Sequence, residues 1–373
     1  MLRDSVAGSE AETEVIPVVA KVRIGSRVVG EGNPTYFVAD IGANHDGNLK
    51  RALSLIAMAA EAGASAAKFQ NFRAETIVSN EGFRALGGSK SHQASWKKSV
   101  VEVYKDATLP MEWTPQLVDA CRTAGIDYFT APYDLSLIDE LEPYVCAWKV
   151  GSGDITWRAA IERMAQSRKP VLIATGASTL DEVTAAVEVA RKWTDQIVLL
   201  QCNTNYTGRS ENFRYLELRV LTVFRQKFPE LVLGLSDHTP GHSAVLGAVA
   251  LGASVIEKHF TDDTTREGPD HRFSLDADAW RDMVGRTREL EAALGSGLKK
   301  VMDNERETVV LQRRAVRAAQ DLASGTVLGA EHLALLRPCP EAGLPPYRID
   351  ELLGRRLKND VGRGELVHID DVM

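Results

Sequence analysis

The chain has 373 residues, of which 44% are hydrophobic, so it can bury a large core in one large domain or in two or three smaller ones. The formal net charge of -7 argues against a general nucleic-acid or anionic-membrane surface, but it leaves room for a local basic pocket that binds an anionic substrate. The 4 cysteines form no C-x-x-C pair, which argues against a disulfide framework and a thiolate zinc site. Residues 1–14 lack the apolar segment of a signal peptide, and no apolar run reaches the roughly 18 residues of a membrane span, so we expect a cytoplasmic protein.

Residues 1–33 form an N-terminal extension that precedes the regular pattern of the chain. Within it, Val15–Val19 and Val22–Val29 are β-prone and could form a small hairpin that closes one end of a barrel. From Tyr36 onward, short β-prone runs end at polar residues and give way to alanine-rich helical stretches. The predicted strands are Tyr36–Ile41, Ala66–Gln70, Ile126–Pro132, Ala147–Ser152, Val171–Thr175, Ile197–Asn203, Leu231–Ser236 and Ser254–His259. The predicted helices include Leu49–Glu61, Pro115–Ala124, Trp157–Gln166, Leu180–Arg191, Phe213–Phe228 and Ser243–Leu251.

This alternation of strands and helices predicts an α/β fold, a (β/α)8 TIM barrel over residues 34–295. An open doubly wound sheet is the alternative, but the first strand is followed by G-A-N-H-D-G (Gly42–Gly47) instead of the glycine-rich phosphate turn G-x-G-x-x-G. A charged segment at 296–312 is predicted to be a linker. From residue 313 to residue 373, short β-prone runs broken by Gly and Pro predict a second, small β-rich domain.

The stretch from Gly234 to Phe260 reads as a strand, a helix of small apolar residues and a second strand. It places His238 and His259 at equivalent ends of two parallel strands, where the active site of a barrel forms. Each histidine alone could be a hydrogen-bonded structural group. The paired positions favour a shared divalent cation, since imidazoles and nearby carboxylates suit Mn2+, Co2+ or Zn2+ acting as a Lewis acid on a carbonyl.

The other strand ends carry lysines, hydroxyls and amides. Two ammonium groups beside hydroxyls make a seat for a phosphate or carboxylate, so the strand ends together predict an anionic small molecule beside a metal-bound aldehyde. Lys68 and Lys149 could instead be solvent-exposed lysines of the barrel rim, and Asp40 could cap the next helix. The polar strand-end residues are Asp40, Lys68, Gln70, Thr130, Lys149, Ser152, Thr175, Asn203, Thr204, Tyr206, Ser236, His238 and His259.

With these residues assembled, the chain resembles the sialic acid synthase family, which condenses phosphoenolpyruvate with an N-acylated amino sugar to give nonulosonic acids. The resemblance runs from about Tyr36 to the C-terminus, where residues 313–373 look like the family's antifreeze-like (SAF, β-clip) domain. The motifs that carry it are V-A-D-I-G-A-N-H-D-G (Val38–Gly47), A-A-K-F-Q (Ala66–Gln70), K-V-G-S-G-D-I (Lys149–Ile155), G-L-S-D-H-T (Gly234–Thr239), V-I-E-K-H-F-T (Val255–Thr261) and G-P-D-H (Gly268–His271).

The resemblance implies a phosphoenolpyruvate-dependent transferase that forms a carbon–carbon bond, and it implies a role for each matching residue. His238 and His259 would hold the metal, normally Mn2+ with Mg2+ or Co2+ as alternatives, and Asp40 would guide the attacking water. Arg337 would reach the N-acyl group from the other subunit of a domain-swapped homodimer. Phosphoenolpyruvate would be bound by Lys68, Thr130, Lys149, Ser152 and Ser236. The sugar would be contacted by Gln70, Tyr206 and Asp270, and Asp154 and Thr204 would be further substrate-binding residues.

The chain departs from the family pattern mainly on the sugar side. Asp40 and Asp154 stand where Glu is most common, Ala174 where Ser is common, and Thr204 where Asn or Ser is common. The segment after Arg337, R-P-C-P-E-A-G-L-P-P-Y, replaces the usual R-P-G-x-G-I. These changes predict an unchanged donor and an acceptor that need not be N-acetylmannosamine.

Three functions therefore stay open at the level of sequence. The first is synthesis of a sialic or related nonulosonic acid, and the second is the same condensation on a different sugar in a specialised metabolite or surface glycan pathway. The third is a non-catalytic carbohydrate-binding homologue, which the intact Lys68, Lys149, His238 and His259 disfavour.

Overall fold

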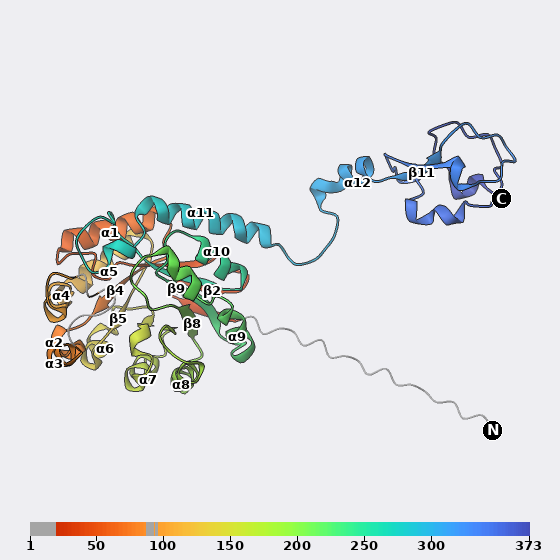
Figure 1. Ribbon diagram of the computed structural model, residues 1–373. Coiled ribbons are helices and arrows are strands. Elements are labelled where there is room, and N and C mark those ends of the chain that lie inside the picture. The colour runs from red at the N-terminus through yellow and green to blue at the C-terminus, as the bar shows by residue number, and fades with distance from the viewer. Residues whose placement is uncertain (1–19, 87–92, 94–95) are drawn as a thin grey trace, which may run out of the picture. The chain divides into compact units, whose positions relative to one another are not determined.

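The computed structural model describes residues 20–86, 93 and 96–373, and the chain divides into two compact units at Gly295 and Ser296 (Figure 1). Each unit is described by itself. The predicted segment Val15–Val19 lies outside the described residues.

The first unit is a closed barrel of eight parallel strands, as the alternation of apolar runs and helices predicts. The strands follow the chain around the barrel, and the barrel closes where β10 pairs in parallel with β3, with His259 opposite Asp40. The strands are β3 (Tyr36–Asp40), β4 (Ala66–Asn71), β5 (Asp127–Pro132), β6 (Trp148–Val150), β7 (Val171–Ala174), β8 (Ile197–Cys202), β9 (Val232–Asp237) and β10 (Val255–His259).

Helices surround the strands on the outside of the barrel (Figure 1). The main ones are α1 (Leu49–Glu61), α5 (Thr114–Ala124), α6 (Leu135–Leu141), α7 (Arg158–Gln166), α8 (Leu180–Arg191), α9 (Val220–Lys227), α10 (Ser243–Ala250) and α11 (Ala277–Leu294). In α1, Asn48 caps the N-terminus by accepting a hydrogen bond from the N–H of Arg51, and residues at helical spacing from Ala52 to Ala59 are buried. These helices cover both the strands and the apolar core.

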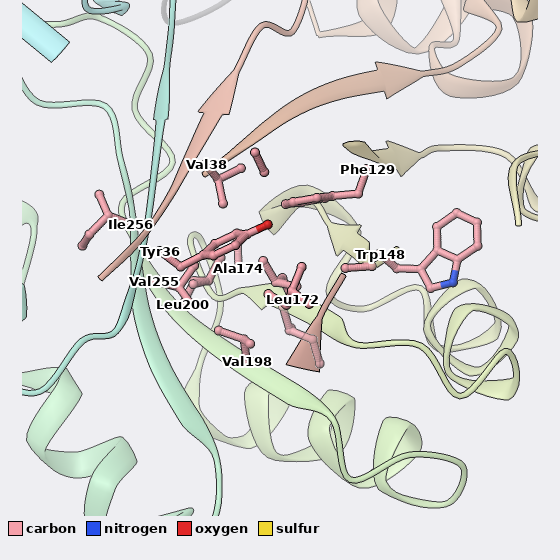
Figure 2. Close-up of a cluster of buried hydrophobic side chains, with 14 of the residues drawn as sticks. Tyr36, Val38, Phe129, Trp148, Leu172, Ala174, Val198, Leu200, Val255 and Ile256 are labelled. Atoms are coloured by element: carbon pink, nitrogen blue, oxygen red, sulfur yellow. The ribbon is translucent and has the colours of Figure 1, made fainter. Parts of the chain in front are cut away.

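The core lies between the strands and on the inner faces of the helices. A parallel strand is buried on both faces, so its sequence is a continuous apolar run rather than an alternating one, and Val171–Ala174 is buried at every position. Figure 2 shows part of this cluster, with Val38, Phe129, Leu172 and Val198 contributed by different strands. This packing fixes the strands and therefore fixes the polar residues at their ends.

A short hairpin precedes the barrel. Lys21–Ile24 (β1) pairs antiparallel with Arg27–Gly30 (β2). The prediction of Val22–Val29 as one strand is therefore wrong, because this segment turns at Gly25 and forms a hairpin by itself. Arg27 donates to Oδ2 of Asp127 at 2.8 Å, at the first residue of β5, and the backbone N–H of Arg23 donates to Gln196 just before β8. The hairpin therefore covers the N-terminal ends of the strands, opposite the predicted site.

The predicted helix Phe213–Phe228 is wrong in its first half. The structure has a 3-10 segment, Ser210–Tyr215, followed by α9, and Glu217 between them adopts a φ of 50°. A left-handed residue cannot continue a right-handed helix, which separates the two segments. Helices not expected from the sequence include α6, α11 and the short α2 (Ala74–Ile77), α3 (Asn80–Ala85) and α4 (Val100–Asp106).

The second unit has a small apolar core of its own. A helix, α12 (Arg306–Gln312), precedes two antiparallel strands, β11 (Ala315–Ala318) and β12 (Leu333–Leu336), and isolated bridges join the remaining extended segments. The core includes Val316, Leu352, Leu357 and Val367. The unit is β-rich, as predicted.

No helix within residues 20–86, 93 and 96–373 is both long and apolar enough to cross a membrane. All 4 cysteines are free thiols.

Candidate active site

A cavity of about 350 Å³ opens at the carboxyl ends of the barrel strands. It lies where barrel active sites form, and its walls carry both strand-end residues and residues from the connecting loops. The structure brings together these predicted residues as its lining: Asp40, Lys68, Gln70, Lys149, Ser152, Asp154, Thr204, Tyr206, Ser236, His238, His259 and Asp270.

Four predicted residues are not among the lining residues: the strand-end residues Thr130, Thr175 and Asn203, and Arg337. Thr130 is fully buried, and its hydroxyl is 2.9 Å from the O of Phe69 and 2.6 Å from Oδ1 of Asn71. The Thr130 side chain therefore makes its hydrogen bonds within the barrel. Arg337 belongs to the second unit, where its Nε donates to the O of Gln312 at 2.7 Å, so its contact with a sugar stays a prediction.

Asp40 is the centre of a buried polar network. Its Oδ2 lies 2.7 Å from Nζ of Lys68 and 3.1 Å from Nε2 of His259, and it accepts a hydrogen bond from Gln70 at 3.2 Å. Asp40 therefore does not cap the next helix, which Asn48 does. Its other oxygen, Oδ1, has no partner among the described residues and is available for a water molecule or ligand.

Glu257 lines the cavity but was not among the site residues identified from the sequence. Its Oε1 lies 3.8 Å from Nζ of Lys68 and 3.7 Å from Nζ of Lys149, and it accepts a hydrogen bond from Ser236 at 3.2 Å. The signal was present, because Glu257 stands two residues before His259 on the same strand, and residues two apart face the same side. Glu257 places one negative charge between the two lysines.

The two lysines are both buried, but their pKa values shift in opposite directions. Burial opposes the charge of Lys68, yet the carboxylates of Asp40 and Glu257 outweigh it and raise the pKa of Lys68 above its ordinary value. Burial dominates at Lys149 and lowers its pKa, with a further contribution from the charge of Lys68. A bound phosphate or carboxylate would place a negative charge next to the ammonium group of Lys149 and offset the effect of burial.

The two histidines face one another with ring centroids 5.6 Å apart. Nδ1 of His238 lies 3.1 Å from the O of Asn203, which assigns a proton to Nδ1. Burial lowers the pKa of His259 to about 3, so this ring is neutral. Its Nδ1 has no hydrogen-bond partner within the described part of the chain and lies 3.8 Å from Oδ2 of Asp270.

This donor set suits a divalent cation with an incomplete protein shell. Imidazole nitrogens and carboxylate oxygens form a mixed set, and His259, Asp40 and Glu257, each with one buried atom that has no hydrogen-bond partner among the described residues, line the cavity. No group of three or more His, Cys, Asp or Glu side chains in the described chain could enclose a metal by itself. Water or substrate would have to complete the shell, as in a catalytic site.

A second buried ion pair holds the end of β9, which His238 follows. Nζ of Lys258 lies 2.6 Å from Oδ2 of Asp237 and donates to the O of Thr239 at 2.6 Å. Asp237 in turn accepts from the N–H of Thr239 at 2.9 Å. Strand alternation explains the arrangement, because Lys258 and Asp237 point away from the cavity while their neighbours point into it.

Gly42 and Asp270 hold the loop after β3 against the site. Gly42 has a φ of 49°, and a Cβ there would lie 2.5 Å from Oδ2 of Asp270, so glycine is required on both grounds. The same oxygen accepts a hydrogen bond from the N–H of Ala43 at 2.9 Å. His45, the histidine of this loop, accepts a hydrogen bond from the N–H of Gly47 in a local turn.

Comparison with known proteins matches both units to families. Residues 55–299 match the model of the NeuB family, and residues 313–373 match that of the SAF domain. The chain is 33% identical to N,N'-diacetyllegionaminic acid synthase of Legionella pneumophila over 91% of this chain and 95% of that protein. It is 30% identical to human N-acetylneuraminate-9-phosphate synthase, over 89% and 90%.

A solved structure gives the same result. N-acetylneuraminic acid (sialic acid) synthetase of Leptospira borgpetersenii, crystallised with citrate, aligns with a TM-score of 0.69 and 28% identity, over 78% of this chain and 95% of that one. The predicted resemblance and the predicted SAF domain are confirmed. Because the family model matches residues 55–299 and the relatives match most of the chain, this chain belongs to the NeuB family.

Proposed function

We propose that the protein is a metal-dependent synthase that condenses phosphoenolpyruvate with an N-acyl amino sugar, giving a sialic or related nonulosonic acid and phosphate. The proposal rests on one observation: Lys68 and Lys149 line the same cavity as His238 and His259. The names of the relatives support the same reaction class.

The chain's own residues account for binding of the donor. Lys68 and Lys149 neutralise the phosphate and carboxylate, and the hydroxyl groups of Ser152 and Ser236 complete the hydrogen bonds. The charges are buried and fixed before the substrate arrives, so they stabilise developing charge with little reorganisation.

His238 and His259 would hold the cation, which we take to be Mn2+, with Mg2+ or Co2+ as alternatives. When bound, it would act as a Lewis acid on the carbonyl oxygen of the open-chain sugar. Asp40, with one unpartnered oxygen, is suited to orient a water molecule toward the carbon that bears the phosphate ester.

The reaction is tested with phosphoenolpyruvate labelled with 18O at the bridging oxygen, Mn2+ and a panel of N-acyl hexosamines. We expect phosphate release and a nonulosonic acid product by mass analysis, with the label in the phosphate because the C–O bond breaks. Label in the keto acid would contradict the proposed bond cleavage. Sugar binding without phosphate release under any metal would favour the non-catalytic alternative.

We further propose that the protein is a homodimer in which the SAF domain of one chain completes the cavity of the other. The predicted role of Arg337 and the independent core of the second unit support this arrangement. Replacement of Arg337 by Ala should raise the KM for the acceptor by about 10- to 100-fold, the effect of losing a charged hydrogen bond, and leave the KM for phosphoenolpyruvate unchanged.

Subunit mixing provides the control for this prediction. Lys149→Met inactivates the donor site, and Arg337→Ala inactivates the acceptor contact. If the domains are swapped, a hybrid dimer has one cavity with both defects and one with neither, so mixing after unfolding and refolding should restore activity. A mixture no more active than its components would contradict the swap, and light scattering at the mass of one 40.8 kDa chain would contradict the dimer.

A further inference from the structure

A buried histidine that the proposed reaction does not use joins two loops at the carboxyl ends of the strands. One is the loop after β3, Gly42–Gly47, and the other is the connection between β10 and α11, residues 260–276. The histidine is His271, in the second loop, and its side chain is 0% exposed. Asp46 and His271 belong to motifs that carry the family resemblance, but the resemblance assigns a role to neither.

Both ring nitrogens of His271 have partners. Nε2 lies 2.9 Å from Oδ1 of Asp46, and Nδ1 lies 2.7 Å from Oγ1 of Thr261. The other carboxylate oxygen of Asp46 accepts two hydrogen bonds from Arg266, from Nη2 at 2.7 Å and from Nε at 3.1 Å. Asp46 thus binds two residues of the connection between β10 and α11. The four residues Asp46, Thr261, Arg266 and His271 are here called the histidine clasp.

The backbone on both sides of the clasp is fitted to this contact. Asp46 has a φ of 51°, a left-handed conformation that Asp and Asn adopt more readily than other residues with a side chain. Gly268 packs against the ring of His271, since a Cβ there would lie 2.5 Å from Cδ2 of the ring. A residue with a side chain keeps a left-handed conformation only where surrounding contacts hold it, and for Asp46 those contacts are the clasp.

The segment that begins at Asp270 contacts the proposed metal ligands. Oδ2 of Asp270 lies 3.8 Å from Nδ1 of His259. Phe273 lies edge-on to both imidazoles, with ring centroids 4.8 Å from that of His259 and 5.7 Å from that of His238. One short segment therefore carries a carboxylate and an aromatic ring beside the two histidines, and His271 ties that segment to the loop after β3.

We infer that Asp46 and His271 are positioning residues, which join the two loops and so fix Asp270 and Phe273 against the ring of His259. None of the four clasp residues lines the cavity, so their effect passes through Asp270 and Phe273. A metal-binding imidazole is oriented by the groups around it, and losing such a group costs 10- to 100-fold in metal affinity or activity. The inference rests on the proposed function for its metal and kinetic test, and on geometry alone for its spectroscopic test.

The spectroscopic test uses the full-length chain, free of metal and substrate and labelled with 15N-histidine. The ring signals of His259 are identified by their loss in His259→Ala. Asp46→Gly removes the carboxylate and still accepts a positive φ, so the loop keeps its backbone conformation. The His259 signals should shift in this variant, because Asp270 and Phe273 lose their fixed places. Asp46→Asn should keep them close to the wild type, since Asn tolerates the same φ and offers an oxygen to His271.

Asp127→Ala is the matched control for the loss of the carboxylate. Asp127 also accepts hydrogen bonds from an arginine and from a ring-bearing side chain, Arg27 and Tyr36, each at 2.8 Å, but it lies at the opposite end of the barrel strands. The control should leave the His259 signals in place. Unchanged signals in Asp46→Gly would overturn the inference, and so would equal shifts in Asp46→Gly and Asp127→Ala, which would indicate a general effect on folding.

The second test measures the metal and the reaction. In Asp46→Gly, Mn2+ binding followed by electron paramagnetic resonance should weaken by about tenfold, with Asp46→Asn and Asp127→Ala close to the wild type. The KM for phosphoenolpyruvate should not change, because Lys68 and Lys149 lie outside the clasp. Wild-type Mn2+ affinity in Asp46→Gly would overturn the inference. If the wild type neither binds Mn2+ nor releases phosphate, the proposed function is rejected, and the His259 signals alone decide the role of the clasp.

Discussion

Replacement of His259 by Ala is expected to lower turnover by more than about a hundredfold and to weaken Mn2+ binding by at least the same factor. Loss of a residue that only orients a metal ligand already costs 10- to 100-fold in affinity or activity, and here one of only two imidazoles would be removed. Mn2+ bound to the full-length variant can be measured by electron paramagnetic resonance without substrate. The measurement is therefore independent of turnover.

His242 supplies the matched control for this prediction. It lies in the connection between β9 and α10, where its Nδ1 is 3.1 Å from Oδ2 of Asp282, and it does not line the cavity. His242→Ala should bind Mn2+ and turn over substrate like the wild type. Wild-type Mn2+ affinity in His259→Ala would show that the cation is held elsewhere, and equal losses in both variants would point to a general effect on folding.

The barrel was predictable because parallel strands leave a strong trace in sequence. Each strand lies in a short apolar run that stops at a polar residue, as in Val232–Asp237. The helices in the connection between β4 and β5 were not predictable in the same way. α2, α3 and α4 have seven residues or fewer, too short for a helical periodicity to repeat and too short to be stable without tertiary packing.

α11 was missed although its signal was present. Asp276 caps its N-terminus by accepting from the N–H of Ala279, and Trp280, Met283 and Thr287 are buried at helical spacing. The candidate site was predicted more completely than the helices, since polar residues at the ends of parallel strands must meet at one face. Thr130 shows the limit of that argument, because its hydroxyl pairs with the neighbouring strand and does not reach the cavity.

The proposed metal ligands, His238 and His259, also depend on Lys258, whose side chain does not line the cavity. Lys258→Met is expected to lower the free energy of unfolding by about 3–5 kcal/mol, because it leaves the carboxylate of Asp237 buried without a counter-charge. The side chains of Lys258 and Asp237 are 1% and 0% exposed, so solvent does not screen the loss. Urea unfolding of the wild type and the variant, monitored by circular dichroism, gives the difference.

Two further variants separate the buried charge from other effects of the substitution. Adding Asp237→Asn to Lys258→Met removes the charge but keeps an oxygen to accept from Thr239, so the double variant should recover part of the loss. Lys97→Met breaks an ion pair with Glu267 in which the two side chains are 81% and 82% exposed, so it should leave the urea midpoint of unfolding nearly unchanged. A double variant less stable than Lys258→Met would contradict the explanation.

The ion pair between Lys258 and Asp237 should also affect the metal site. Lys258 binds both Asp237 and the O of Thr239, the residues on either side of His238, so it fixes the backbone from which that imidazole projects. In Lys258→Met, at a temperature where the variant is folded, Mn2+ affinity should fall by about 10- to 100-fold, as for other residues that position a ligand. Unchanged Mn2+ affinity in the folded variant would mean that the ion pair only stabilises the barrel, and that strand packing alone positions His238.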